Sequence, residues 1–398
     1  MVVLAFVAAA MGQFVGMAIV LTPLWRGGDF HWTERARRGW SARLVAAAPL
    51  SLFIISFLGS GAGLTNPVSF LLPAATFFGA VVGTIPGLRA VLRRRVTLRS
   101  LLGEYVVAFS LRTPATIVFL AMFLLLLWRS WDVETVEIMG LSLLLALLLS
   151  LGAAVPLVRL LGLLTAPSER LITIVQRAAA QTGVQPPPVF VLHWQAANAI
   201  AFPFARFVAF TPSIIELLSD DELTAVAAHE IAHLSESRAQ KLIRLSGVLV
   251  IFPLFALPVL IRRFEVLGFI LPFTMAVAGG RFLRAFAQKL ERRADAAAHS
   301  EAEQGAALAT ALEKLYEFNL VPAIMPGKRQ IHPHLYDRML AAGLQPTYPR
   351  PAPPRRWLAL LGGIVSATIS LSPLALSEGP IGQWVDHQVN VHRRHWSD

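Results

Sequence analysis

Long runs of apolar residues alternate with short polar segments along most of this chain. Most of these runs approach the roughly 20 residues that an α-helix needs to cross about 30 Å of hydrocarbon. The predicted membrane spans are Val2–Leu21, Leu44–Leu64, Val68–Val91, Pro114–Trp128, Ile138–Leu161, Leu245–Ile261, Val266–Gly280 and Trp357–Leu376. The pattern therefore predicts a mainly α-helical, multi-pass membrane protein with about eight spans.

The segment between the fifth and sixth apolar runs has the pattern of a soluble domain. Ser168 can cap a helix that continues to about Gln181, and Gly183 followed by prolines can end it. Three segments rich in β-forming residues come next, namely VFVLHW from Val189, NAIAF from Asn198 and RFVAFT from Arg206. Ser219 and Glu222 form an S-x-x-E capping box that opens another helix. These signals predict a small α+β domain inside the membrane protein.

The polar loops between the N-terminal runs differ in charge. Arginines crowd the first and third loops, the second loop is uncharged, and the fourth contains Asp132, Glu134 and Glu137. Cytoplasmic loops are enriched in Lys and Arg, so the first and third loops are predicted to be cytoplasmic and the N-terminus to lie outside. Five crossings then place the α+β domain, which follows Leu161, on the cytoplasmic side of the membrane.

Composition agrees with a membrane protein and narrows its chemistry. The chain is 55% hydrophobic and 15% charged, whereas a soluble domain is about 25% charged. The net charge of +11 is interpreted as basic loops beside anionic lipid. No Lys/Arg run alternates with stacking aromatic residues, so we expect no nucleic-acid partner. The absence of cysteine excludes disulfides, thiolate catalysis and Cys-ligated zinc.

The stretch LTAVAAHEIAHLSES contains the pattern H-E-x-x-H at His229, Glu230 and His233. On an α-helix, positions i and i+4 lie on one face, so both imidazoles can bind one metal ion. Glu230 would then lie beside the metal, where it could take a proton from water. A surface helix with incidental histidines is the alternative interpretation. The small apolar residues that flank the pattern favour a helix packed in a cleft, and hence a zinc site.

Catalytic zinc needs a third protein ligand and an open position. A third histidine six residues after His233 is missing, because Ala239 occupies that place. Glu291 is the best candidate, and Asp295 follows it by four residues, so that one can bind zinc while the other orients a ligand histidine. Other candidates for the third ligand are His299, Glu301, Glu303, Glu313 and Glu317.

HEIAH followed by ERRAD resembles the H-E-x-x-H … E-x-x-A-D signature of integral-membrane zinc metalloproteases, the family of the type-one CaaX prenyl protease and the HtpX-type protease. The motifs that match span roughly Ala166–Gly343. The resemblance implies a gluzincin-type domain with one Zn²⁺ per chain. It implies that His229, His233 and Glu291 bind the metal and that Asp295 orients a ligand imidazole.

Two more segments resemble elements of the same family. NAIAF matches a strand with the pattern N-A-x-A, which implies that Asn198 and Ala199 hold an extended substrate as an added strand. IHPHLYDRM matches the element H-P-x-x-x-x-R, which implies that His332 and Arg338 stabilise the oxyanion during catalysis.

The sequence therefore predicts a membrane-embedded zinc endopeptidase, with Glu230 as general base, that cleaves membrane or membrane-associated proteins. It is expected in the inner (plasma) membrane, with its active site on the cytoplasmic side. We predict an N-terminal membrane domain at 1–163, a protease domain at 164–348 that is interrupted by a membrane hairpin at about 245–280, and a Pro/Arg linker with a last span at 349–398. A signalling receptor with a zinc-protease module and a catalytically silent membrane scaffold remain as alternatives.

Overall fold

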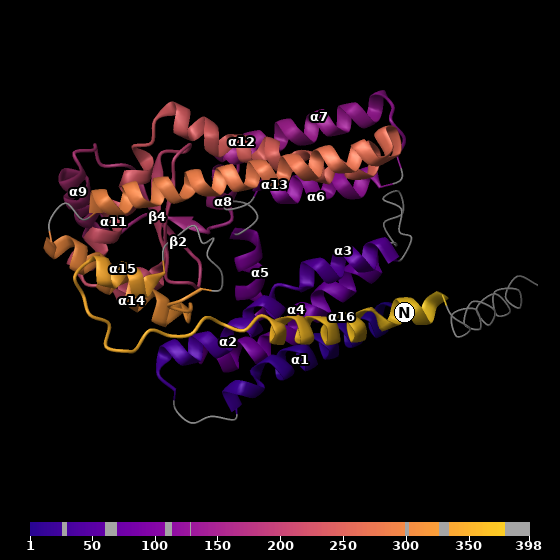
Figure 1. Cartoon of the computed structure of the whole chain (residues 1–398), viewed down its shortest axis with the longest axis horizontal. Coiled ribbons are helices and arrows are strands. Elements are labelled where there is room, and N and C mark those ends of the chain that lie inside the picture. The colour runs from indigo at the N-terminus through magenta and orange to yellow at the C-terminus, as the bar shows by residue number, and fades with distance from the viewer. Residues whose placement is uncertain are drawn as a thin grey trace, which may run out of the picture. The chain divides into compact units, whose positions relative to one another are not determined.

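The fold is mainly helical with one small mixed sheet, as predicted (Figure 1). A computed structural model describes residues 1–25, 30–59, 70–107, 114–127, 129–298, 302–325 and 334–378. Contacts divide the chain into two compact units. Unit 1 comprises residues 1–101, 320–322 and 351–398, and unit 2 comprises residues 102–319 and 323–350. The division into three functional regions stays a prediction.

Six helices in the described ranges are long and apolar enough to cross a membrane, which confirms the multi-pass architecture. They are Val2–Trp25, Trp32–Leu58, Leu71–Leu92, Val133–Ala153, Leu257–Ala296 and Trp357–Leu374. The predicted span Pro114–Trp128 corresponds to a shorter apolar helix, Ala115–Leu126. The predicted span Leu245–Ile261 is divided between two consecutive helices.

Unit 1 is a bundle in which the last described helix packs along the first (Figure 1). Its elements are α1 (Val2–Trp25), α2 (Trp32–Ala46), α3 (Pro49–Gly59), α4 (Leu71–Leu92) and α16 (Trp357–Glu378). A Cβ placed on Gly362 would lie 2.8 Å from the carbonyl oxygen of Gly16, so the backbones of α1 and α16 are in close contact. Buried Gln13 donates to the Val45 carbonyl at 2.7 Å and accepts from the Ser366 hydroxyl at 2.6 Å. The C-terminal span is therefore part of the same bundle as the N-terminal span.

A helical hairpin dominates the membrane part of unit 2. This part contains α6 (Pro114–Leu126), α7 (Val133–Leu148), a π-helical segment (Leu149–Ala153), α8 (Val155–Leu160), α12 (Arg238–Phe255) and α13 (Leu257–Ala298). Regular helix geometry fails inside α13 at Glu265, where φ is 50°. A Cβ on Gly268 would collide with the Leu260 carbonyl oxygen, and one on Gly279 would lie 2.7 Å from Val250 Cγ1. Residues eight apart in a straight helix are about 12 Å apart, so the chain must reverse at Glu265.

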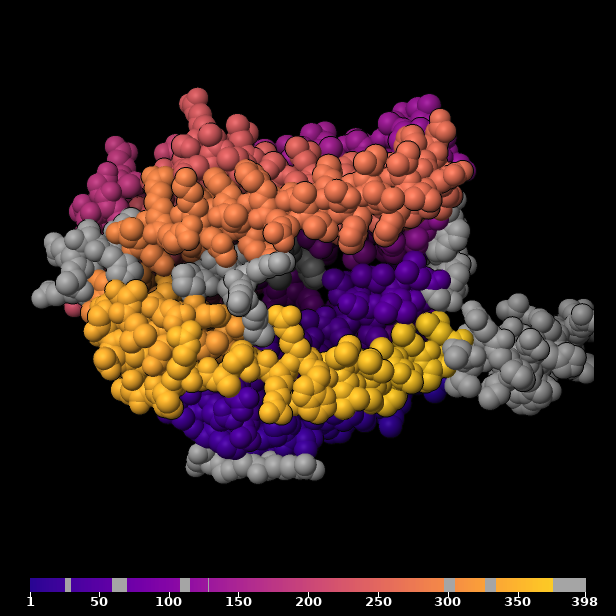
Figure 2. Space-filling view, in the orientation of Figure 1, coloured from indigo at the N-terminus to yellow at the C-terminus, as the bar shows by residue number. Residues whose placement is uncertain are grey.

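The second arm of this hairpin continues without interruption toward the C-terminal end of α13. The predicted span ended at Gly280, whereas the helix runs on to Ala298. Figure 2 shows the surface of α13, in orange, running the length of unit 2. Large apolar side chains are exposed along the arm: Val266, Leu267, Phe269, Ile270, Leu271, Phe273, Met275, Val277 and Phe282. Such a surface suits contact with lipid.

The remaining part of unit 2 is the α+β region. It contains the end of α5 (Leu98–Val107), β1 (Leu164–Thr165), α9 (Glu169–Thr182), β2 (Val189–Leu192), β3 (Ala199–Phe202), β4 (Phe207–Phe210), α10 (Pro212–Leu217), α11 (Asp220–Leu234), α14 (Ala302–Asn319) and α15 (Leu335–Ala341). The strand order is β1-β2-β4-β3, so β3 lies at an edge. The cap at Ser168, the left-handed Gly183 and the capping box at Ser219 are as predicted.

Candidate metal centre and active-site cleft

Helix α11 places both histidines of the H-E-x-x-H pattern on one side. Its capping box fixes where the helix begins, and Ala227, Ala228 and Ile231 pack into the core of the α+β region. Because the opposite face of α11 is anchored in this way, His229 and His233 face α13, and only 9% and 8% of their surfaces are exposed. His229 and His233, which the sequence spaces at i and i+4, thus lie on one face of α11 and form one side of a buried site.

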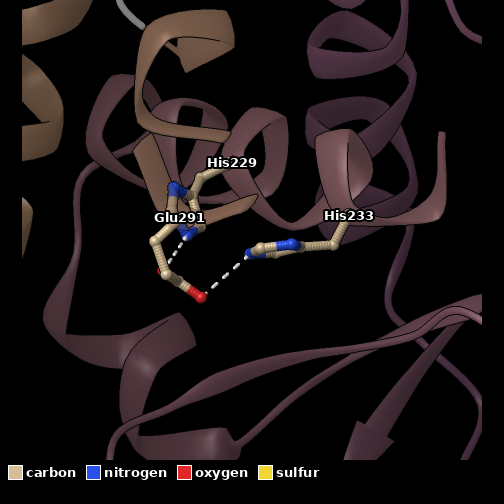
Figure 3. Close-up of side chains that lie close together, drawn as sticks. All are labelled: His229, His233 and Glu291. Atoms are coloured by element: carbon tan, nitrogen blue, oxygen red, sulfur yellow. Dashed lines mark ion pairs between the residues drawn. The ribbon is translucent and has the colours of Figure 1, made fainter. Parts of the chain in front are cut away.

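Glu291 on α13 completes a set of three ligands. One ligand atom from each of His229, His233 and Glu291 lies within 4.8 Å of the others. In Figure 3 the carboxylate of Glu291 lies between the two imidazoles. Its oxygens are 3.7 Å from His229 Nε2 and 3.6 Å from His233 Nε2. Tetrahedral zinc with ligands at about 2.0–2.1 Å needs neighbouring ligand atoms about 3.3–3.4 Å apart. Two neutral imidazoles and one carboxylate at this spacing fit Zn²⁺.

The second nitrogen of His229 faces Asp295. His229 Nδ1 lies 3.1 Å from Asp295 Oδ1, and the same oxygen accepts a hydrogen bond from Arg338 Nη2 at 2.5 Å. The distance agrees with the predicted role of Asp295, which stays a proposal. Arg338, on α15, was predicted to stabilise an oxyanion. The structure places its guanidinium on Asp295, and its predicted oxyanion role stays a proposal.

The second nitrogen of His233 faces a carboxylate that sequence reasoning missed. His233 Nδ1 lies 3.3 Å from Glu236 Oε1, and Arg244 donates to both oxygens of Glu236 at 2.6 and 2.7 Å. Burial alone would raise the pKa of the Glu236 carboxyl, but the hydrogen bonds from His233 and Arg244 outweigh burial and lower this pKa. A glutamate three residues after the second histidine was the available signal in the sequence.

Glu230 lies beside the ligands in a cleft of about 270 Å³. Its Oε2 accepts a hydrogen bond from the Ala201 backbone N–H at 2.8 Å, which fixes the carboxylate relative to strand β3. Burial raises the pKa of the Glu230 carboxyl, against the opposing effects of the two histidines and the Ala201 hydrogen bond. A raised pKa makes this carboxylate a better proton acceptor, which a general base requires.

Strand β3 forms one wall of the cleft and exposes part of its backbone. Asn198 and Ala199 both line the cleft. The backbone N–H and C=O of Asn198 are bonded to Thr211, which leaves its side chain as the group available for other contacts. Ala201 N–H points away from β4 to Glu230, and Ala199 has the same orientation because backbone groups alternate along a strand. An extended peptide could therefore bond to Ala199.

Some predicted residues lie outside the described part of the chain. His332, predicted to act on the oxyanion, falls in 326–333, and the alternative ligands His299 and Glu301 fall in 299–301. Among the described alternatives, Glu317 is exposed, and neither Glu313 nor Glu317 belongs to the ligand cluster. The described residues therefore support Glu291 as the third ligand.

Comparison with known proteins agrees with this geometry. Residues 165–343 match the family model Peptidase family M48, which confirms the resemblance seen in the motifs. A protease HtpX homolog from Picrophilus torridus is 40% identical over 76 residues, which is 18% of this chain and 25% of that protein. The protease HtpX from Glaesserella parasuis is 32% identical over 88 residues, or 21% and 31% of the two chains. The aligned part thus spans only about a quarter to a third of these relatives. No solved structure matches at comparable significance.

Proposed function

We propose that the protein is a membrane-embedded zinc endopeptidase that cleaves membrane or membrane-associated proteins. The premise is that residues 165–343 form an M48-type metallopeptidase region. One observation carries the proposal. The ligand cluster of His229, His233 and Glu291 lies beside Glu230 in a cleft whose wall is an edge strand. A membrane scaffold without catalytic activity would not need Glu230 to lie between the metal ligands and the edge strand β3.

The chain's own residues supply binding and proton transfer. When bound, zinc polarises the scissile carbonyl and lowers the pKa of water at the site. Ala199 would hold the substrate backbone as an added strand, which places a peptide bond beside Glu230. Glu230 takes the proton of the attacking water and returns it to the leaving amine. Asp295 orients His229, and the predicted oxyanion roles of His332 and Arg338 remain proposals.

The position of the site along α13 supports membrane-associated substrates. The same uninterrupted helix carries the apolar arm that starts at Val266 and the ligand Glu291. Arg281 and Arg284 are the first charged residues of the arm after its turn. Glu291 follows Arg284 by seven residues, which is roughly 10 Å along a helix. If these arginines mark the membrane surface, a cleaved peptide bond lies close to the bilayer.

We also propose that the α12–α13 hairpin crosses the membrane completely. The reversal at Glu265 leaves two apolar arms, Leu245–Ile261 and Val266–Gly280, which are shorter than the roughly 20 residues that cross about 30 Å of hydrocarbon, so the bilayer would thin around them. Arg262, beside the reversal, donates to the carbonyls of Leu126 and Arg129 at the end of α6. The tip therefore lies at the same end of unit 2 as the connection from α6 to α7. With the basic loops inside, this connection is external and the cleft is cytoplasmic.

Single cysteines test this topology, because the chain has no native cysteine. Arg263, Arg238 and Glu317 are exposed. With a membrane-impermeant thiol reagent on intact cells, we expect Arg263→Cys to be labelled. Arg238→Cys and Glu317→Cys should be labelled only after permeabilisation, which also serves as their positive control. Labelling of Arg238→Cys on intact cells would place the cleft outside, and protection of Arg263→Cys would indicate a re-entrant hairpin.

Metal removal tests the proposed activity. The purified full-length chain should cleave casein or a membrane-protein reporter, and a zinc chelator should abolish this cleavage because the ligands alone cannot activate water. Stoichiometric zinc, added after removal of the chelator, should restore the rate. A chain that binds zinc but cleaves neither substrate would favour the scaffold or the receptor over the protease.

A further inference from the structure

A carboxylate oxygen lies near Nδ1 of each metal-binding histidine, at 3.1 Å for His229 and 3.3 Å for His233. Each of these carboxylates forms an ion pair with an arginine. For His229 the set is Asp295 and Arg338, which the E-x-x-A-D motif and α15 provide. For His233 the corresponding set is Glu236 and Arg244. We propose that Glu236 is the positioning residue of His233 and that Arg244 fixes Glu236. This inference rests on the proposed zinc-dependent function.

Two groups lie near His233 Nδ1, and Glu236 Oε1, at 3.3 Å, is closer than Arg244 Nη2, at 3.5 Å. Because the Nε2 lone pair of His233 faces Glu291 and the metal position, the ring proton must lie on Nδ1. Glu236 Oε1, 3.3 Å from Nδ1, is placed to accept that proton in a hydrogen bond. This bond selects the ligating tautomer and limits rotation of the ring. The side chain of Glu236 is 2% exposed, so water competes little for the contact.

Arg244 determines where the Glu236 carboxylate lies. Its Nε and Nη2 donate to the two oxygens at 2.7 and 2.6 Å, in the two-pronged geometry that arginine forms with carboxylates. Glu236 stands between α11 and α12, where the chain has no helical hydrogen bonds to hold it. Arg244 belongs to α12 and also lines the cleft. The bidentate pair thus fastens this connection to the first arm of the membrane hairpin.

The two arms of the hairpin consequently reach the metal site from different sides. Helix α13 provides Glu291 and Asp295 directly, and α12 reaches His233 through Arg244, which binds Glu236. Gln240 on α12 accepts from Arg293 on α13 at 3.2 Å, which joins the arms at the level of the site. If α12 and α13 shifted relative to each other, the carboxylates beside both histidines would move, and the histidines would lose their positions as ligands.

A matched pair of buried glutamates on or next to α11 allows a direct test. Glu222, in the first turn of α11, is 7% exposed and pairs with Lys314 at 2.7 Å, but it contacts no metal ligand. Zinc affinity is measured by chelator competition on the full-length protein in detergent. We expect Glu236→Gln to weaken affinity by about tenfold to a hundredfold, the range for loss of a carboxylate that supports a ligand histidine. Glu222→Gln should leave the affinity unchanged.

Cobalt substitution separates positioning from general stability. The visible absorption of Co²⁺ bound in place of zinc reports ligand geometry, so its bands should shift in Glu236→Gln and in Arg244→Lys but not in Glu222→Gln. Arg244→Lys keeps the positive charge but loses the two-pronged contact with Glu236. This variant can replace Glu236→Gln in the experiment if the Glu236 variants do not fold. The double variant should bind zinc no more weakly than the weaker single variant, because the two residues act as one unit.

Two results would overturn the inference. One is a zinc affinity and cobalt spectrum of Glu236→Gln identical to those of the parent chain. The other is an equal effect of Glu222→Gln, which would show that loss of any buried ion pair suffices. These results are distinct from failure of the proposed function, because in that case the parent chain itself would bind no zinc or cleave no protein.

Discussion

Glu230→Gln should retain one zinc per chain and lower kcat by about a hundredfold to ten-thousandfold, the range for removal of a general base. Glu230 lies next to the ligands but is not one of them, and its Oε2 is held by the Ala201 backbone at 2.8 Å. The amide of glutamine preserves the shape of the side chain but cannot accept a proton from water. The measurement is kcat on a casein or membrane-reporter substrate, together with zinc content by elemental analysis.

The matched control for Glu230→Gln is Glu216→Gln. Glu216 is an exposed glutamate on α10 in the same α+β region. Its variant should cleave at the parent rate. Parental activity in Glu230→Gln would exclude this residue as the base, and concurrent loss of zinc would show that it supports the metal. Because Glu230→Gln should still bind substrate, peptides that copurify with it can be identified by mass spectrometry to define the substrate class.

Glu291→Ala should lose most of its zinc and all measurable proteolysis. Both histidine Nε2 atoms face the Glu291 carboxylate at 3.6–3.7 Å, so its removal leaves two neutral ligands. Zinc held by two imidazoles lacks both the charge and the third protein ligand that catalytic sites have. Zinc content after dialysis against a weak chelator, measured beside the parent chain, checks this expectation.

Glu317→Ala is the control for the third ligand. Glu317 was a competing candidate in the sequence, and it is exposed on α14, outside the ligand cluster. Its variant should keep full zinc and full activity. Full zinc in Glu291→Ala, or loss of zinc in Glu317→Ala, would mean that the third ligand had been assigned to the wrong helix.

The features that the sequence predicted correctly are local or periodic. The apolar runs of α1, α4, α7 and α16 identify spans, because the energetic demand of the hydrocarbon core acts on every residue of the run. The cap at Ser168 and the capping box at Ser219 depend on residues within one turn. His229 and His233 could be paired from spacing alone, because one helical turn separates them.

The features that the sequence left open depend on distant parts of the chain. Two short apolar runs predicted a membrane hairpin, and the position of its turn, at Glu265 with Gly268 against Leu260, appears only in the structure. The last span had no assigned role, and its packing against α1 through Gly362 and Gly16 appears only in three dimensions. Helix–helix contacts of this kind depend on backbone approach, which composition does not encode.

The sequence by itself determined that this is a multi-pass membrane protein with a zinc-binding H-E-x-x-H helix, because hydropathy and helical spacing act over a few turns. Only the tertiary structure brought Glu291 next to the two histidines, placed Arg338 on Asp295, and joined Glu236 and Arg244 to His233. These side chains come from different helices. Their distances follow from how α11, α12, α13 and α15 pack, and packing is a property of the whole fold rather than of any one segment.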